Sequence, residues 1–225
     1  MAVFRPFKAF RPRPDLAGEI ASKPYDVLNS DEAREEAKGH PLSFLHVGKP
    51  EIDLDPALDI HDPSVYAKGK ENLDNLIAQG ALVEDNDEYI YVYAQTMNGR
   101  TQYGLVGCAS VADYWNDIIK KHEKTRKDKE EDRCNHVRVT NAHTGPIFLT
   151  YRDNEEINEI VNNVIKNKPD NDLVAADGIR HTSWVIRDKD LCLKVEKILS
   201  KVDYFYVADG HHRSAAASRV AAARR

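Results

Sequence analysis

An Asn-Gly pair at residues 98 and 99 constrains the fold more than any other short stretch of this sequence. It stands between two runs rich in aromatic and β-branched residues, which together read EYIYVYAQTMNGRTQYGLVGCASV, residues 88–111. Asn-Gly favours a two-residue turn in which both residues have positive φ, and such a turn joins antiparallel strands. We therefore expect a hairpin, and a fold made only of parallel strands and crossover helices is disfavoured.

The rest of the chain predicts helices mixed with short strands. The N-terminal residues 1–24, which contain several prolines and arginines, predict an extended segment with one short strand. The densely charged stretch 113–141 is helical in composition, as one broken helix or two. Caps, composition and periodicity predict further helices over 30–39, 63–80, 154–166 and 189–201, and strands over 43–47, 145–151, 181–188 and 203–209. Because these elements do not alternate strictly, we expect one α+β domain over residues 1–225, with a mixed sheet flanked by helices.

Composition and charge disfavour several classes of partner. With 225 residues the chain can bury a core without disulfides or metals. The formal net charge is −5, so the field of the whole molecule does not attract nucleic acid or an anionic membrane. The three cysteines are far apart and have no metal-ligand spacing, which is typical of free thiols in a reducing compartment. No run approaches the roughly 20 apolar residues of a membrane span, and no signal peptide is evident. We therefore expect a cytoplasmic protein without membrane partners or direct nucleic-acid contacts.

The last 22 residues, YFYVADGHHRSAAASRVAAARR, carry the strongest candidate site. A strand ends at Asp209, Gly210 makes a sharp turn, and an alanine-rich helix follows. The free N–H groups and the positive dipole of a helix start favour an anion. The arginine supplies a planar fork suited to phosphate, and the two histidines supply donors. Taken singly, each residue has a simpler interpretation, since Asp-Gly before a helix is common. As a block they predict a phosphate site made of Gly210, His211, His212, Arg213 and Ser214, with Asp209 to cap the helix, orient a histidine or hold a metal ion.

Three weaker constellations lie elsewhere. In the charged stretch, helical spacing puts Lys121, Thr125 and Lys129 on one face, and His122, Arg126 and Arg133 on another. Such a run is commonly a solvated face with i,i+4 ion pairs. The Pro-Tyr-Asp turn at residues 24–26 is often only a turn. Two histidines lie on or beside apolar strands, where a satisfied core or edge histidine is the simpler interpretation; His46 is left out of the site, and His181 is a candidate for the pocket floor.

Several segments resemble known families. ADGHHR after an apolar strand resembles the ligand-binding motif of the ParB/sulfiredoxin-like superfamily, which includes nucleotide-binding partition proteins, sulfiredoxins and free-serine kinases. KPYDVL (23–28), HPLSFLHVGKPEID (40–53), IIKKHEKTRKDKEEDR (118–133) and YVADGHHRSAA (206–216) together resemble the domain of unknown function 1015 family over essentially all 225 residues. The resemblance implies a ParB/sulfiredoxin-like core elaborated by insertions. Because members of this family are usually longer, we expect a C-terminal truncation within the last helix.

The resemblance implies a nucleotide, ATP or ADP, with Mg²⁺, and phosphoryl transfer to a small hydroxyl metabolite. No metal-ligand set is assigned from the residues themselves. Phosphate contacts would come from the terminal block together with Thr125, Arg126 and Arg133. The implied catalytic residues are Asp26, Glu123, His122 and Asp209, with Asp26 or Glu123 as base or metal ligand, and Tyr25 and His181 would contact the substrate.

Two alternatives stay open. The first is a ParB-like, nucleotide-dependent binding module with a protein or nucleic-acid partner and no transfer chemistry. The second is a structural or oligomerisation fragment in which the motif is vestigial. Independently of these alternatives, the protein could form a homodimer. The sequence contains no Walker-type phosphate loop, no Rossmann glycine fingerprint and no Gly-x-Ser-x-Gly elbow. P-loop kinases, dehydrogenases and α/β hydrolases are therefore disfavoured.

Overall fold

The computed structural model describes residues 2–225, which form two compact units. Unit 1 comprises residues 2–18, 83–120 and 150–206, and unit 2 comprises residues 19–82, 121–149 and 207–225. Each unit is assembled from three separate segments, so no single cut in the chain would divide them. The expectation of a single domain over residues 1–225 stays a prediction.

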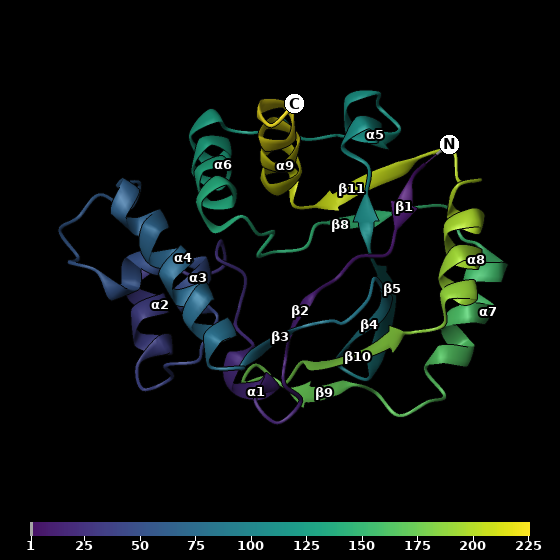
Figure 1. Ribbon diagram of the computed structural model, residues 1–225, viewed down its shortest axis with the longest axis horizontal. Helices are drawn as coiled ribbons and strands as arrows, with labels where there is room; N and C mark the ends of the chain where they lie inside the picture. Colours follow the sequence, from purple (N-terminus) through teal and green to yellow (C-terminus); the bar gives the residue numbers. More distant parts are fainter. Residues whose placement is uncertain (1) are drawn as a thin grey trace. The chain divides into compact units, whose positions relative to one another are not determined.

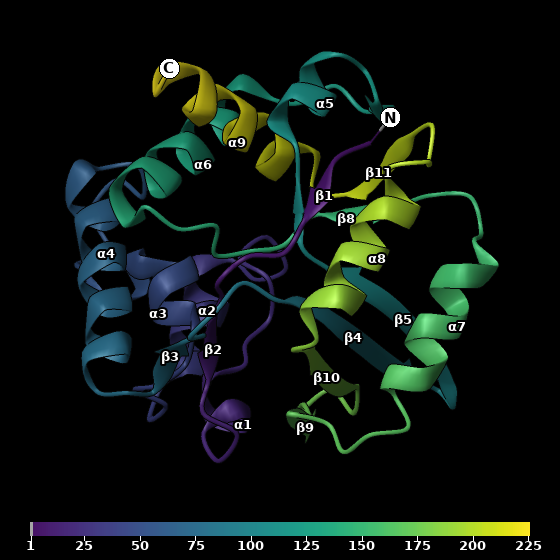
Figure 2. The same cartoon turned by 45° about the vertical axis from the view of Figure 1, so that its right-hand side comes forward.

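Unit 1 contains the largest sheet, four antiparallel strands in the order β5-β4-β10-β9. Its strands are β4 (Ile90–Met97), β5 (Arg100–Val106), β9 (Asn171–Val174) and β10 (Arg180–Ile186). The turn between β4 and β5 is Asn98 and Gly99 with φ of 51° and 78°, which confirms the predicted hairpin. Helices α7 (Glu155–Val164) and α8 (Lys189–Leu199) lie side by side next to this sheet (Figures 1 and 2). Burial of apolar residues on β4, β10 and α8 forms the core of this unit.

Short strand pairs complete the β structure. Strand β1 (Phe4–Arg5) pairs antiparallel with β6 (Cys108–Ala109), and β2 (Phe10–Pro12) pairs with β3 (Leu82–Glu84). A three-stranded sheet has the order β7-β11-β8, from β7 (Ile119–Lys120), β11 (Phe205–Asp209) and β8 (Phe148–Thr150). Strands β7 and β11 run parallel, with Phe205 opposite Ile119. Two short helices, α1 (Ala17–Ile20) and α5 (Val111–Trp115), accompany these strands in the sequence.

Unit 2 is mainly helical. It contains α2 (Ser30–Ala37), α3 (Leu45–Gly48), the 3₁₀ helix η1 (Pro50–Asp53), α4 (Pro63–Ala78), α6 (Lys127–Thr140) and α9 (His211–Ala223). Helix α4 packs against α6, and α6 packs against α9; Figures 1 and 2 both show α6 and α9 side by side. Cys134 on α6 and Ala216 and Val220 on α9 are buried together. The small side chains of the alanine-rich helix let the two backbones approach closely, so the residues that start both helices come near each other.

Two predicted elements are wrong in part. Residues 43–47 were expected to form a buried strand, but Leu45–Gly48 is a helical turn. Leu45 packs there against α2 and η1, and no neighbouring strand offers a ladder to this segment. The charged stretch 113–141 is helical at its two ends only. Residues 119–120 pair with β11, and residues 121–126 have no regular structure. The parallel ladder with β11 holds the backbone extended where local composition favours helix.

The fold class is confirmed at the level of a mixed α+β protein with small sheets flanked by helices. Within residues 2–225, no helix combines the length and the apolar composition that crossing a membrane would require.

Candidate functional site

The predicted junction between strand, glycine and helix is present at the end of β11. Gly210 is the N-cap residue of α9 and has φ of 88°, in the left-handed region. A Cβ at this position would lie 3.0 Å from Cγ2 of Ile147 and 3.3 Å from Nε of Arg213. Glycine is therefore required both by the backbone conformation and by the space around it. No side chain caps α9, so the N–H groups of its first turn point outward without a side-chain acceptor.

The start of α6 lies against the start of α9. The N–H of Arg126, the N-cap residue of α6, donates to Nε2 of His212 at 3.1 Å. Like α9, α6 has no side-chain cap. Two positive dipole ends and two sets of free N–H groups therefore meet in one place. This arrangement favours an anion more strongly than a single helix start.

His211 occupies the first turn of α9 and is buried, with 6% of its surface exposed. Its Nδ1 lies 3.2 Å from Oε2 of Glu123, and its ring meets the ring of His122 edge to face with centroids 4.5 Å apart. Its Nε2 is buried and has no hydrogen-bond partner within residues 2–225. A buried polar atom without a partner costs free energy, so this nitrogen is the observation here that points to a ligand.

Arg213 is held in place rather than free. One terminal nitrogen donates to Oδ2 of Asp209 at 2.6 Å, and the other donates to the carbonyl of Pro146. The side chain lies between two glycines, since a Cβ on either Gly145 or Gly210 would approach it to within 3.4 Å. Only 15% of the Arg213 side chain is exposed, against 67% for Asp209. Arg213 therefore connects the start of α9 to the loop before β8, and its bond to Asp209 holds that carboxylate at the start of α9.

The other predicted residues near the helix starts are engaged in short contacts. The Arg126 side chain is exposed and pairs with Asp128 at 2.6 Å. The Thr125 hydroxyl donates to the carboxylate of Glu130. The Ser214 hydroxyl donates to the carbonyl of Gly210 at 3.0 Å, inside the first turn of α9. The predicted helical faces are wrong for residues 121–126, because that segment is irregular; its residues reach α9 through tertiary contacts.

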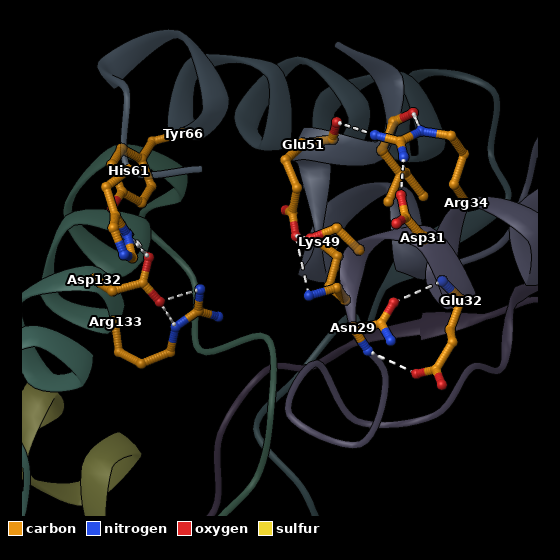
Figure 3. Close-up of polar contacts among 12 residues, drawn as sticks. Asn29, Asp31, Glu32, Arg34, Lys49, Glu51, His61, Tyr66, Asp132 and Arg133 are labelled. Carbon is orange, nitrogen blue, oxygen red and sulfur yellow. Dashed lines mark hydrogen bonds and ion pairs between the residues drawn. The ribbon is translucent and has the colours of Figure 1, made fainter. Parts of the chain in front are cut away.

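Arg133 and Tyr25 form a second cluster in unit 2. The guanidinium carbon of Arg133 lies 3.9 Å from the ring centroid of Tyr25, a cation–π contact. Arg133 also pairs with Asp132 at 2.7 Å, and both side chains are nearly buried. Asp132 in turn accepts from the Tyr66 hydroxyl at 3.0 Å and lies 3.3 Å from Nδ1 of His61 (Figure 3). Arg133 is thus neutralised inside a buried network.

The same contacts determine the charge states in this cluster. Burial raises the pKa of Tyr25, while the positive charges of Arg133 and Arg213 act in the opposite direction. Burial and the charge of Asp132 raise the pKa of Tyr66 to about 12. Burial acts to raise the pKa of Asp132 as well, but the charge and hydrogen bond of Arg133, the hydrogen bond from Tyr66 and the charge of His61 together outweigh it, and the pKa lies below the usual range. Tyr25 therefore stays neutral within electrostatic range of two arginines, one of them in the α9 junction.

Two further predicted site residues, and the histidine left out of the site, have partners of their own or face solvent. Asp26 is exposed beside Tyr25. His181 belongs to unit 1, where its Nδ1 lies 2.5 Å from the Tyr93 hydroxyl. His46, which was left out of the site, hydrogen-bonds Asp53 at 2.7 Å, and this bond raises its pKa. His46 is therefore a satisfied histidine, although it lies on α3 and not on a strand.

Some participants were missed by sequence reasoning. Pro146 and Ile147 contact Arg213 and Gly210, and Asp132 links Arg133 to Tyr66. A Gly-Pro pair before a strand indicates a turn, but nothing in the sequence says which helix start it approaches. Asp132 belongs to a segment that carries the family resemblance, but it was not chosen as a site residue, because nothing local indicates that it accepts from Tyr66.

The profile of a protein family described as "Protein of unknown function (DUF1015)" matches residues 4–225. The chain belongs to this family. The match covers every candidate residue of both units, and it confirms the family resemblance seen in the motifs. No curated protein and no solved structure matches this DUF1015 chain. Its chemistry therefore has to be argued from the site.

Proposed function

We propose that this DUF1015 protein binds a nucleotide through its phosphates at the adjoining starts of α6 and α9, and that it transfers a phosphoryl group to a small hydroxyl metabolite. The observation that carries the proposal is the buried His211, whose Nε2 has no partner within residues 2–225, in the first turn of an uncapped helix. The ParB/sulfiredoxin-like resemblance of the Asp-Gly-His-His-Arg block supports the finer version, a kinase.

The local electrostatics suit a phosphate. Two uncapped helix starts supply N–H donors and partial positive charge. Arg126 is 70% exposed, and the one ion pair that it makes within residues 2–225 is with the exposed Asp128. Solvent screens such a surface pair, so it contributes little. The Arg126 guanidinium can therefore exchange a carboxylate for a phosphate at little cost. Phosphoryl transfer needs mainly positioning and neutralisation of charge, and these residues are suited to both.

The residues also fit Mg²⁺ that arrives with the nucleotide. Within residues 2–225 no three His, Cys, Asp or Glu side chains are grouped to hold a metal ion by themselves. Mg²⁺ in phosphoryl-transfer sites is held by one or two carboxylates and by the phosphates of the substrate. Glu123 and Asp209, which are 58% and 67% exposed, provide such carboxylates. When bound, Mg²⁺ would neutralise charge on the phosphates.

A thermal-shift titration tests the binding step. The native protein is titrated with ATP, ADP, CTP and inorganic phosphate, each with and without Mg²⁺. A ligand at 100 times its Kd should stabilise the fold by about 2.7 kcal/mol. Arg126→Ala should weaken the shift. Arg180→Ala is the matched control, because Arg180 is also an exposed arginine paired with one aspartate, at 2.5 Å, but lies on β10 in unit 1. It should leave the shift unchanged.

Arg213→Ala should abolish the nucleotide shift. Because this variant also loses the bonds to Asp209 and Pro146, its shift is measured from its own ligand-free Tm. A folded native protein that no nucleotide stabilises would contradict the proposal. Stabilisation by a nucleotide without any transfer of phosphate would instead favour the ParB-like binding module, and duplex DNA would then be the next ligand to titrate.

A further inference from the structure

Strand β5 forms one edge of the four-stranded sheet in unit 1, and in the described chain no strand pairs with its outer side. The hairpin register places Met97 opposite Arg100, and the pair that closes a two-residue hairpin is hydrogen-bonded. Hydrogen-bonded and non-hydrogen-bonded pairs alternate along the ladder, so the N–H and C=O groups of Thr101, Tyr103 and Leu105 point away from β4. Within residues 2–225 these groups have no backbone partner. The outer side of β5 therefore presents a row of free donors and acceptors.

The two edges of this sheet differ in how they are protected. Strand β9, the opposite edge, has four residues, and Asp172 on it pairs with Arg180 at 2.5 Å. Strand β5 has seven residues and contains no proline, lysine or carboxylate. Its one charged residue, Arg100, stands next to the turn, and the alternation of side chains directs it to the face opposite that of Tyr103. Proteins commonly block an exposed edge by shortening it or by placing charge or proline on it. Because β5 lacks these features, it can accept a further strand.

A cavity of about 250 Å³ lies beside this edge, between Tyr103 and Leu105 of β5 and helix α7. Ile157 and Val161 of α7 are buried and make part of its wall apolar, whereas Asn158 is exposed and supplies an amide. Sites for small molecules usually measure about 300–1,000 Å³, so this cavity suits a single side chain better than a whole metabolite. Alternate residues of a strand added to β5 would point to the same face as Tyr103, and one of them would enter the cavity.

Carboxylates lie on the α7 side of the cavity. The Asn158 amide donates to Oδ1 of Asp153 at 2.8 Å, and Glu155 precedes Asn158 by three residues, which places it on the same side of the helix. Both carboxylates are exposed, and neither forms an ion pair within residues 2–225. Segment 152–162 contains four acidic residues and one basic residue, Arg152. A strand that carries lysine or arginine next to its inserted residue would therefore be attracted to this surface.

We propose that the β5 edge and its cavity bind an extended segment of a partner protein. The segment adds to β5 as an antiparallel fifth strand, inserts an apolar side chain into the cavity and carries lysine or arginine two positions to either side. The antiparallel direction follows the pairs of the sheet itself and is slightly more stable than the parallel one. A second copy of this chain fits less well, because pairing of β5 with itself about a two-fold axis would bring the acidic sides of both α7 helices to the same face. The surface lies wholly in unit 1 and does not depend on the proposed nucleotide site.

Fluorescence anisotropy of a labelled peptide, Thr-Lys-Val-Leu-Val-Lys-Thr, tests the proposal on the native protein. In an added strand the leucine and both lysines of this peptide point to the same face. We expect saturable binding with a Kd below about 1 mM. N-methylation of the leucine removes a hydrogen bond to β5 and should weaken binding by about tenfold or more. N-methylation of the two valines, whose N–H groups point away from β5, should change the Kd by less than about twofold. Glutamate in place of both lysines should weaken binding.

Variants of the protein test the same contacts from the other side. Tyr103→Pro removes an outward N–H but leaves the ladder with β4 intact, and edge strands tolerate proline at such a position. Tyr103→Val is the matched control, because it also loses the ring but keeps the N–H; we expect proline to bind the peptide about tenfold more weakly than valine. Glu155→Gln should weaken binding by about two- to fivefold. Glu156→Gln is its control, since Glu156 is also exposed but lies about 100° further around α7, away from the cavity.

Several outcomes would overturn the proposal. They are no saturable binding to the native protein, equal affinity for the two N-methylated peptides, and tighter binding of the glutamate peptide. These comparisons use the native protein, so they decide even if Tyr103→Pro does not fold. Equal affinities of Tyr103→Pro and Tyr103→Val would also count against strand addition. Sedimentation velocity tests the other occupant: a native dimer that Tyr103→Pro dissociates would place a second copy of this chain on β5 and overturn the assignment to a partner protein.

Discussion

Replacing Gly210 by alanine tests whether the α9 junction is as tightly built as its contacts indicate. An L-residue in the left-handed region costs about 1–2 kcal/mol. Alanine also restricts the unfolded chain, which offsets about 0.4–1 kcal/mol of that cost. The backbone term alone should therefore lower the free energy of unfolding by roughly 1 kcal/mol.

Crowding adds a second term at this position. The new Cβ would lie 3.0 Å from Cγ2 of Ile147 and 3.3 Å from the guanidinium of Arg213, and the Arg213 side chain is held by Asp209 and Pro146. Overpacking of this kind typically costs about 1–3 kcal/mol. We expect Gly210→Ala to lose about 2–4 kcal/mol in total.

Gly80→Ala is the matched control within the same unit. Gly80 follows α4 with φ of 67°, and a Cβ there would meet no atom within 4 Å. Urea denaturation followed by circular dichroism should show a loss of about 1 kcal/mol for Gly80→Ala, from the backbone term alone. Equal losses in the two variants would refute the reasoning, because Ile147 and Arg213 would then yield freely and the junction would not be a rigid site.

Two further predictions concern charge. Burial lowers the pKa of His136 to about 4, and the charge of Arg133 acts in the same direction. Because unfolded histidine titrates near 6.5, the free energy of unfolding should be highest above about pH 6.5 and should fall by up to about 3 kcal/mol as the pH is lowered toward 4. The urea midpoint should therefore decrease between pH 7 and 5. In His136→Gln the midpoint should depend less on pH. Asp85→Asn should destabilise by about 2–3 kcal/mol, because it leaves a partly buried Arg11 without its carboxylate. Asp172→Asn removes a more exposed pair, which solvent screens, and should cost clearly less in the same urea assay, so similar losses would contradict this assignment.

Elements that are stabilised by interactions between near neighbours in the chain could be predicted from the sequence. Asn98 and Gly99 both adopt positive φ, so the hairpin follows from two residues. The junction at Gly210 follows in the same way, because a strand, a glycine and an alanine-rich helix are each readable from a few neighbours. The helical turn at Leu45–Gly48 did not follow, since its apolar residues are equally compatible with a strand and only their packing against α2 and η1 decides.

The sequence by itself therefore determined which residues of the terminal block stand at a helix start, and with them the chemistry suited to an anion. Only the tertiary structure determined which partners the site residues have and how deeply they are buried. It brought Glu123 and His122 to the ring of His211, engaged Arg213 with Pro146, and enclosed Arg133 in a buried ion pair. The physical reason is that these contacts join residues about 70 to 90 positions apart or depend on burial, and neither the periodicity nor the local propensity of a segment carries that information.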